Sequence, residues 1–151
     1  MPQSLSNVLL HVVFSTKNRH PFLEDRELRN ELNGVFIGIL RKIHCDSLCV
    51  ESVADHIHCL CQLSRTVTIA RLVEEMKTKT SVWLKTQAEY LENFYWQSGY
   101  GAFSVSPENV PAVKQYIKNQ EEHHRSESIQ DEFRRLLRQH RIEFDERYVW
   151  D

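Results

Sequence analysis

The sequence of 151 residues lacks the features that mark several classes of protein. No apolar run approaches the roughly 18 residues needed to cross a membrane, and the chain does not open with the basic and apolar stretches of a secretory signal. Glycine is scarce, with only four residues, and there is no glycine-rich phosphate loop followed by a lysine. We therefore expect a cytoplasmic protein with no membrane and no nucleotide cofactor among its partners.

No large excess of either charge is present. The formal net charge of −2 does not by itself indicate a protein that binds nucleic acid. Basic residues do gather between positions 65 and 85, where only Glu74 and Glu75 oppose them. This segment predicts a local basic surface, although a solvated helix face would produce the same pattern.

Four cysteines are present, and the sequence leaves two interpretations of them open. They are Cys45, Cys49, Cys59 and Cys61. In a reducing cytosol they are most simply buried thiols, and two cysteines on the same face of one strand have poor geometry for a disulfide. The alternative is a structural zinc site, but spacings of C-x3-C and C-x-C do not match a familiar zinc ribbon.

The apolar spacing predicts a single α+β domain over residues 1–151. We expect strands at 8–15, 47–53, 56–63 and 102–105, and helices at 25–43, 69–84, 106–125 and 129–140. The order βαββαβ followed by two helices is the ferredoxin-like pattern, an antiparallel sheet with two helices on one face. The core would span about 7–105, and a further helix and tail about 128–151 would follow the third helix.

One predicted strand carries a pair of histidines, His56 and His58. Alternate side chains of a strand point to opposite faces, so the two imidazoles share one face while Ile57 and Cys59 share the other. The apolar face is the one that the two helices would cover. Two neutral imidazoles at this spacing can bind one divalent metal ion, although the pair alone does not establish a metal site.

The third predicted helix carries Tyr116 and, one turn later, Gln120. A phenol can act as a nucleophile that forms a covalent intermediate, and a carboxamide oxygen can be a third, neutral metal ligand. The simpler alternative is a tyrosine packed on the sheet with a solvated glutamine. The following His123 and His124 could assist the site, but we expect them at the helix surface or behind the metal ligands, since only one of two adjacent residues can face a site.

Three segments together resemble one known family. They are His56-Ile57-His58, residues 96–104 (WQSGYGAFS) and residues 116–124 (YIKNQEEHH), and the opening residues 11–17 (HVVFSTK) are also similar. In this order and spacing they resemble the single-tyrosine HUH transposases of small bacterial insertion sequences, the IS200-like family, which includes relatives associated with repetitive palindromes. The resemblance extends over nearly the whole chain.

The resemblance implies a DNA transposase that binds single-stranded DNA folded into a hairpin. It implies that His56, His58 and Gln120 bind Mg²⁺ or Mn²⁺ and that Tyr116 attacks the DNA backbone. The tyrosine becomes linked to the 5′ phosphate, and a 3′ hydroxyl later rejoins the strands. The family also implies a homodimer, in which the tyrosine helix of some members crosses to the partner's histidines.

Other roles remain open at this stage. Tyr100 and Tyr148 are rival nucleophiles, but neither has a glutamine four residues later. Hairpin binding would use backbone charge and base stacking. The candidate contacts to DNA phosphates are Lys17, Arg65, Lys77, Lys79 and Lys85, and Trp83 or Trp96 could stack on an unpaired base. The rival function is a module of the same fold that binds a DNA or RNA hairpin without cutting it.

Overall fold

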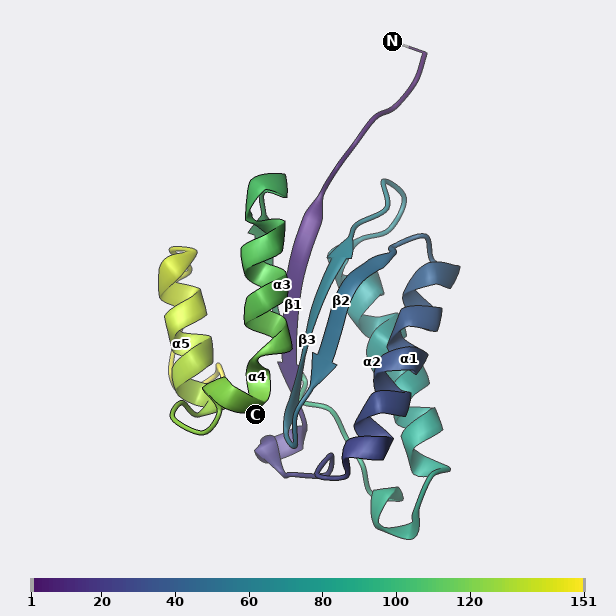
Figure 1. Cartoon of the computed structure of the whole chain (residues 1–151), viewed down its shortest axis with the longest axis vertical. Coiled ribbons are helices and arrows are strands. Elements are labelled where there is room, and N and C mark those ends of the chain that lie inside the picture. Colours follow the sequence, from purple (N-terminus) through teal and green to yellow (C-terminus); the bar gives the residue numbers. More distant parts are fainter. Residues whose placement is uncertain (1, 151) are drawn as a thin grey trace.

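A four-stranded antiparallel sheet forms the centre of the molecule, with helices on both of its faces (Figure 1). The computed structural model describes residues 2–150. The strands are β1 (Leu9–Ser15), β2 (Ser47–Ser52), β3 (His56–Gln62) and β4 (Gly101–Val105), in the spatial order β2-β3-β1-β4. This order confirms the predicted ferredoxin-like arrangement.

Helices α1 (Arg26–Lys42) and α2 (Ile69–Lys85) begin at the residues that their capping signals predict. The carboxylate of Asp25 accepts hydrogen bonds from the backbone N–H groups of Glu27 and Leu28, and the hydroxyl of Thr68 accepts one from Arg71. Such caps satisfy N–H groups that have no partner within the helix. Both helices lie on the same face of the sheet (Figure 1).

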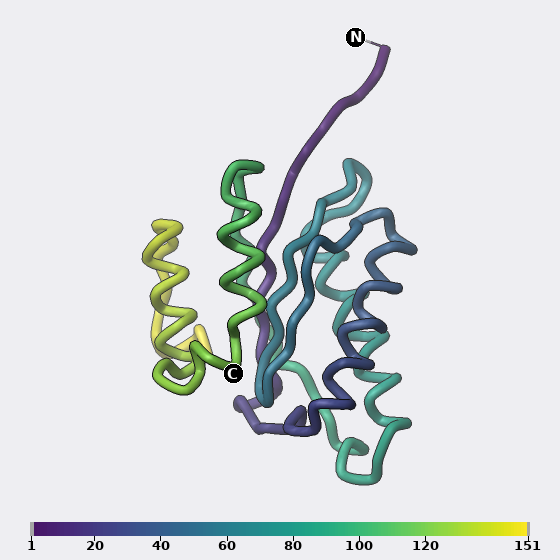
Figure 2. Tube along the Cα trace, in the orientation of Figure 1, coloured from purple at the N-terminus to yellow at the C-terminus, as the bar shows by residue number. Residues whose placement is uncertain are grey.

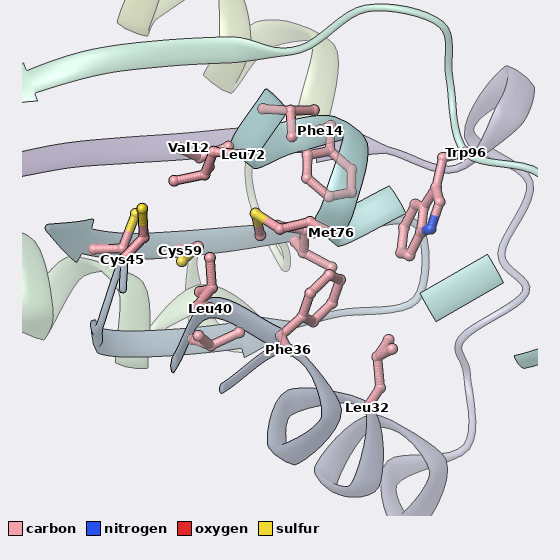
Figure 3. Close-up of a cluster of buried hydrophobic side chains, with 14 of the residues drawn as sticks. Val12, Phe14, Leu32, Phe36, Leu40, Cys45, Cys59, Leu72, Met76 and Trp96 are labelled. Atoms are coloured by element: carbon pink, nitrogen blue, oxygen red, sulfur yellow. The ribbon is translucent and has the colours of Figure 1, made fainter. Parts of the chain in front are cut away.

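The larger core lies between these two helices and the sheet (Figure 3). Phe14 from β1 and Phe36 from α1 are buried there, and Trp96 packs edge-on against Phe14 with ring centroids 5.0 Å apart. The Trp96 indole N–H donates a hydrogen bond of 3.0 Å to the Thr80 hydroxyl. A buried tryptophan donor is therefore satisfied, and the aromatic segment after α2 is fixed to the core.

The opposite face of the sheet is covered by the C-terminal third of the chain. This part forms α3 (Val110–Lys118), α4 (Gln120–His123) and α5 (Ile129–Gln139). Figure 2 shows this green-to-yellow part on the side of the sheet opposite α1 and α2. A smaller core joins Val13 and Phe103 of the sheet to Phe133 of α5. The imidazoles of β3 therefore face a covered surface.

The predicted third helix is not continuous. A short 3-10 turn (Pro107–Asn109) precedes α3, and the helix is interrupted at Asn119, whose φ of −95° and ψ of 21° are not helical. Asparagine is a poor helix former because its side chain competes for backbone hydrogen bonds. The expectation of one helix over 106–125 was therefore wrong. Two other short 3-10 turns lie at Lys17–Arg19 and Glu89–Leu91.

The cysteines are free thiols, and three of the four are buried. Burial raises the pKa of Cys45, and a hydrogen bond with Cys61 together with burial raises the pKa of Cys59. Within residues 2–150 the sulfur atoms do not form a group that could hold a metal ion. The buried-thiol interpretation fits this arrangement. None of the described helices is long and apolar enough to span a bilayer.

Candidate active site

The two histidines of β3 are both buried, and each is oriented by a partner at its Nδ1 atom. His56 Nδ1 lies 2.6 Å from a carboxylate oxygen of Asp55, and His58 Nδ1 lies 2.7 Å from Nε2 of His11 on β1. Both Nε2 atoms then face the space between the sheet and the C-terminal helices. A partner on one ring nitrogen that leaves the other free is the usual arrangement of metal-binding histidines.

Tyr116 and Gln120 reach the same space from α3 and the start of α4. The Tyr116 ring lies edge-on to the His58 ring, with centroids 5.9 Å apart. Gln120 Oε1 lies 3.2 Å from His56 Nε2. The four residues predicted for the catalytic site are therefore close together, and a single chain supplies all of them.

Glu132 of α5 lies at the centre of the cluster, and the sequence analysis did not find it. Its side chain is fully buried. Oε1 lies 3.0 Å from Nε2 of both His58 and His124, and Oε2 accepts hydrogen bonds from the Tyr116 hydroxyl and from the Gln120 amide. A signal was present, because Glu132 falls on the apolar stripe of its helix beside Phe133, where a charged residue is unexpected.

Two more groups contact Tyr116. Arg135, one turn after Glu132 on α5, donates a hydrogen bond of 2.7 Å to the Tyr116 hydroxyl. The His123 ring lies 4.7 Å from the Tyr116 ring between centroids. His123 and His124 are both half-buried and both contact the site, so the expectation that only one of them faces it was wrong. Both histidines lie beyond the interruption at Asn119, in the last turn of α4 and at its C-terminal end.

Burial and the carboxylates set the protonation of the cluster. Burial lowers the pKa of His11 to about 3 and of His58 to about 4. For His56, burial is outweighed by hydrogen bonds with Asp55 and Glu132, which raise its pKa to about 9. The site without metal therefore pairs a protonated His56 with an ionised Glu132, while His11 and His58 are neutral.

The same environment shifts the pKa values of Glu132 and Tyr116, which share a hydrogen bond. Burial alone would raise the pKa of Glu132, but hydrogen bonds with three imidazoles hold it well below its usual range. Burial and the charge of Glu132 raise the pKa of Tyr116 above its usual value, and Arg135 opposes this. The phenol is therefore neutral in the protein without metal.

The donor atoms fit a divalent metal ion. Single donor atoms of His56, His58, His124 and Glu132 all lie within 4.8 Å of one another. Imidazole nitrogens and a carboxylate oxygen are common ligands of divalent first-row metals. Gln120 Oε1, next to His56, is a further oxygen donor.

A cavity of about 300 Å³ opens beside Tyr116, between the sheet and the C-terminal helices. Its lining includes His11, Asn109, Tyr116, Arg135 and His140. The cavity therefore connects the phenol ring with polar and cationic side chains from three different elements. This is the arrangement expected of a pocket that orients a polar ligand.

Three of the predicted DNA contacts lie on α2, on the face of the sheet opposite Tyr116 (Figure 1). Lys77 donates hydrogen bonds of 2.7 Å to the backbone carbonyls of Gln97 and Gly99. Lys79 forms an ion pair of 2.7 Å with Glu75, and the Lys85 ammonium lies 4.6 Å from the centroid of the Tyr95 ring. Lys17, in the 3-10 turn after β1, and Arg65, in a turn before α2, are exposed. The contacts described above for the three lysines of α2 are with residues outside the histidine cluster.

The rival nucleophiles lie away from the cluster. Tyr100 is 39% exposed and its ring lies near the Lys77 ammonium, whereas Tyr148 is 78% exposed and its ring lies under Arg147. Within residues 2–150, the rings in contact with His56 and His58 include that of Tyr116 but not those of Tyr100 or Tyr148. Tyr116 is thus the tyrosine that the fold places beside the histidines.

Comparison with known proteins identifies the class. Residues 4–120 match the family described as "Transposase IS200 like". The chain belongs to the IS200-like transposase family. The match ends at Gln120, so Glu132 and Arg135 lie beyond it. A search of curated protein sequences gave no significant match.

Two solved structures share the fold. One is a proposed transposase from Deinococcus radiodurans R1, with a TM-score of 0.62 and 21% identity, which covers 80% of this chain and 95% of that one. The other is a REP-associated tyrosine transposase bound to a REP hairpin, with a TM-score of 0.59 and 17% identity, which covers 82% of this chain and 72% of that one. At these identities the likeness concerns the fold alone.

Proposed function

We propose that this protein is a DNA transposase that binds single-stranded DNA hairpins and cuts and rejoins them through a 5′-phosphotyrosine intermediate. One observation carries the proposal. The Tyr116 hydroxyl, the Gln120 carboxamide and the Nε2 atoms of His56 and His58 converge on one buried cluster within a single chain. A protein that only bound a hairpin would have no physical need for this combination.

Metal dependence follows from the donor set. His56, His58 and Gln120 would hold Mg²⁺ or Mn²⁺, with Asp55 and His11 fixing the orientation of the two rings. A bound divalent ion supplies Lewis-acid polarisation of a phosphoryl oxygen and charge for the transition state. Because one phosphodiester is exchanged for another, no nucleotide cofactor is required.

Tyr116 is the proposed nucleophile. Its oxygen forms a bond to phosphorus, the bond from phosphorus to the 3′ oxygen breaks, and the 3′ oxygen leaves as a hydroxyl after it takes up a proton. The Arg135 guanidinium lies 2.7 Å from the tyrosine oxygen, where its charge stabilises negative charge on that atom as the phenol loses its proton. The adjoining cavity would hold a nucleotide beside the broken bond.

Recognition of DNA is the next part of the proposal. The REP-associated relative of known structure is bound to a hairpin, which supports the same type of partner here. The predicted phosphate contacts remain Lys17, Arg65, Lys77, Lys79 and Lys85. Arg65 can be tested on its own. Arg65→Ala should weaken hairpin binding and reduce the slope of log affinity against log salt concentration by about 1. An unchanged slope would exclude Arg65 from the interface.

The functional unit that we propose is a homodimer of single-domain chains (residues 1–151) in the cytoplasm. Each Tyr116 would act beside the histidines of its own chain, because one chain contains the whole cluster. Mixing Tyr116→Phe protein with His58→Ala protein tests this arrangement. Recovered cleavage in the mixture would show instead that the tyrosine acts on the partner's histidines.

The nucleophile assignment is tested by a cleavage assay on hairpin DNA from the regions that flank the gene. Tyr116→Phe removes only the hydroxyl, so cleavage should be abolished while hairpin affinity, measured by fluorescence anisotropy, changes little. Tyr100→Phe is the matched control and should cut normally. Undiminished cleavage by Tyr116→Phe would refute the assignment.

A second candidate function is a binder that does not cut. The observation in its favour is that the Tyr116 hydroxyl is bonded to Glu132 and Arg135 and that burial raises its pKa. A neutral, fully bonded phenol is a weak nucleophile. Tight hairpin binding by the wild-type protein without any cleavage, at any divalent ion tested, would favour this second function.

A further inference from the structure

Glu132 occupies a position that an ordinary helix would give to an apolar residue. On α5 it lies between Ile129 and Leu136 on the stripe that packs against the sheet, and its carboxylate is fully buried. A buried carboxylate is costly unless charge and hydrogen bonds compensate it. The residue also lies beyond residues 4–120, which match the family, so the family match does not account for it.

The two oxygens of this carboxylate have different partners. Oε2 accepts hydrogen bonds from the Tyr116 hydroxyl and, at 3.2 Å, from the Gln120 amide. Oε1 faces only imidazoles, at 3.0 Å from His58 Nε2, 3.0 Å from His124 Nε2 and 3.5 Å from His56 Nε2. The hydrogen bonds from Tyr116 and Gln120 fix the position of Oε2, and they thereby fix Oε1 among the three imidazole rings. Hydrogen bonds to a ligand commonly orient it in this way at metal sites.

The spacing of these atoms is that of ligands around one ion. Bonds of about 2.1 Å place neighbouring ligands about 3.0 Å apart in an octahedral site and about 3.4 Å apart in a tetrahedral one. Two of the three distances from Oε1, both 3.0 Å, match the octahedral value, and the third, 3.5 Å, is close to the tetrahedral one. A divalent ion would also balance the charge of the buried carboxylate.

We propose that Glu132 Oε1 is a metal ligand, and that it forms with His56, His58 and His124 a centre of three imidazoles and one carboxylate. This inference rests on the proposed function, because it concerns the same metal. It extends the ligand set of His56, His58 and Gln120, because the Gln120 amide nitrogen donates a hydrogen bond to the Glu132 carboxylate while Gln120 Oε1 stays beside His56 Nε2. Helix α5 therefore contributes directly to the metal centre.

The donor set determines which ion is preferred. Mg²⁺ favours oxygen ligands and retains several waters, whereas imidazole nitrogens favour first-row transition ions. Three nitrogens and one oxygen should therefore bind Mn²⁺ more tightly than Mg²⁺. A set of two imidazoles and a neutral carboxamide would show a smaller preference, because it offers fewer nitrogens and no anion.

The first test is a titration of the purified full-length protein with Mn²⁺ in the absence of DNA, followed by the electron paramagnetic resonance signal of the free ion. Glu132→Gln keeps the size of the side chain and removes its charge, and we expect its Mn²⁺ affinity to fall at least about tenfold. Gln120→Ala should fall less than Glu132→Gln. Glu143→Gln, an exposed carboxylate on the C-terminal tail, is the matched control and should bind as the wild type.

The second test does not depend on a variant that folds. Electron spin echo modulation of the Mn²⁺-loaded wild-type protein counts coordinated imidazole nitrogens, and we expect three. Two nitrogens, or a Glu132→Gln protein with native circular dichroism and wild-type Mn²⁺ affinity, would overturn the inference. Neither of these results would refute the proposed transposase function, which is tested separately by the DNA adduct on Tyr116. That adduct can form with either ligand set.

Discussion

His11 predicts a specific dependence of stability on pH. In the folded protein without metal its pKa is about 3, lowered by burial and by His58, compared with 6.5 in an unfolded chain. Between these values the unfolded chain binds a proton that the folded protein does not. Unfolding then takes up a proton, so acid favours it and the free energy of unfolding falls as pH decreases below 6.5.

The size of this loss in unfolding free energy follows from the width of the pH interval. From pH 6.5 to pH 5.0 one such histidine costs about 2 kcal/mol, at about 1.4 kcal/mol per pH unit. His58, whose pKa is about 4, should cost a similar amount over the same window. His56 has a folded pKa of about 9 and stays protonated when folded, so it offsets the loss by roughly 0.4 kcal/mol as the unfolded chain takes up its proton. Because an unfolded histidine is already half protonated at pH 6.5, the three histidines together predict a net loss of about 3 kcal/mol.

Urea unfolding at the two pH values, with chelator present, measures this loss. His11→Gln places an amide oxygen near the position of His11 Nε2 and removes the titrating group. Between pH 6.5 and pH 5.0, the free energy of unfolding of this variant should therefore fall by about 2 kcal/mol less than that of the wild type. His44→Asn, at an exposed histidine, is the control and should behave as the wild type. Equal losses in His11→Gln and the wild type would refute the reasoning.

Two further predictions concern packing. A Cβ atom at Gly101 would lie 2.4 Å from the Phe133 ring, so Gly101→Ala should lower the free energy of unfolding by about 1–3 kcal/mol and loosen α5, which hydrogen exchange of that helix would detect. Full protection of α5 in this variant would contradict the close approach. Thr80→Val leaves the Trp96 indole N–H without its acceptor and should cost about 1–3 kcal/mol, measured by urea unfolding against a Thr86→Val control at the helix end.

The sequence predicted the scaffold because its signals are local. Strand alternation placed His56 and Ile57 on opposite faces, and apolar spacing predicted the two helices that the structure shows as α1 and α2. Short connections between these elements then leave few possible spatial orders for the four strands of the sheet. The fold class and the family were both confirmed.

The remainder of the site depends on contacts between distant segments. Glu132 reaches His58 across 74 positions of sequence, and no spacing rule connects a residue of α5 with a strand residue so far away. The break at Asn119 was equally hidden, because asparagine lowers helix propensity without forbidding a helix. The position of Glu132 on an apolar helix stripe is a signal in the sequence, but its partners become known only when α5 is packed on the sheet.

The central claim is that Tyr116 becomes covalently linked to DNA in a reaction that requires a divalent ion. The most direct measurement is the intact mass of the protein after incubation with single-stranded hairpin DNA from the gene's flanks, with Mg²⁺ or Mn²⁺ and, separately, with chelator. We predict an oligonucleotide adduct that forms only with metal, maps to Tyr116 and is absent from Tyr116→Phe. Cleavage of the hairpin without any adduct, or an adduct on another residue, would contradict the account.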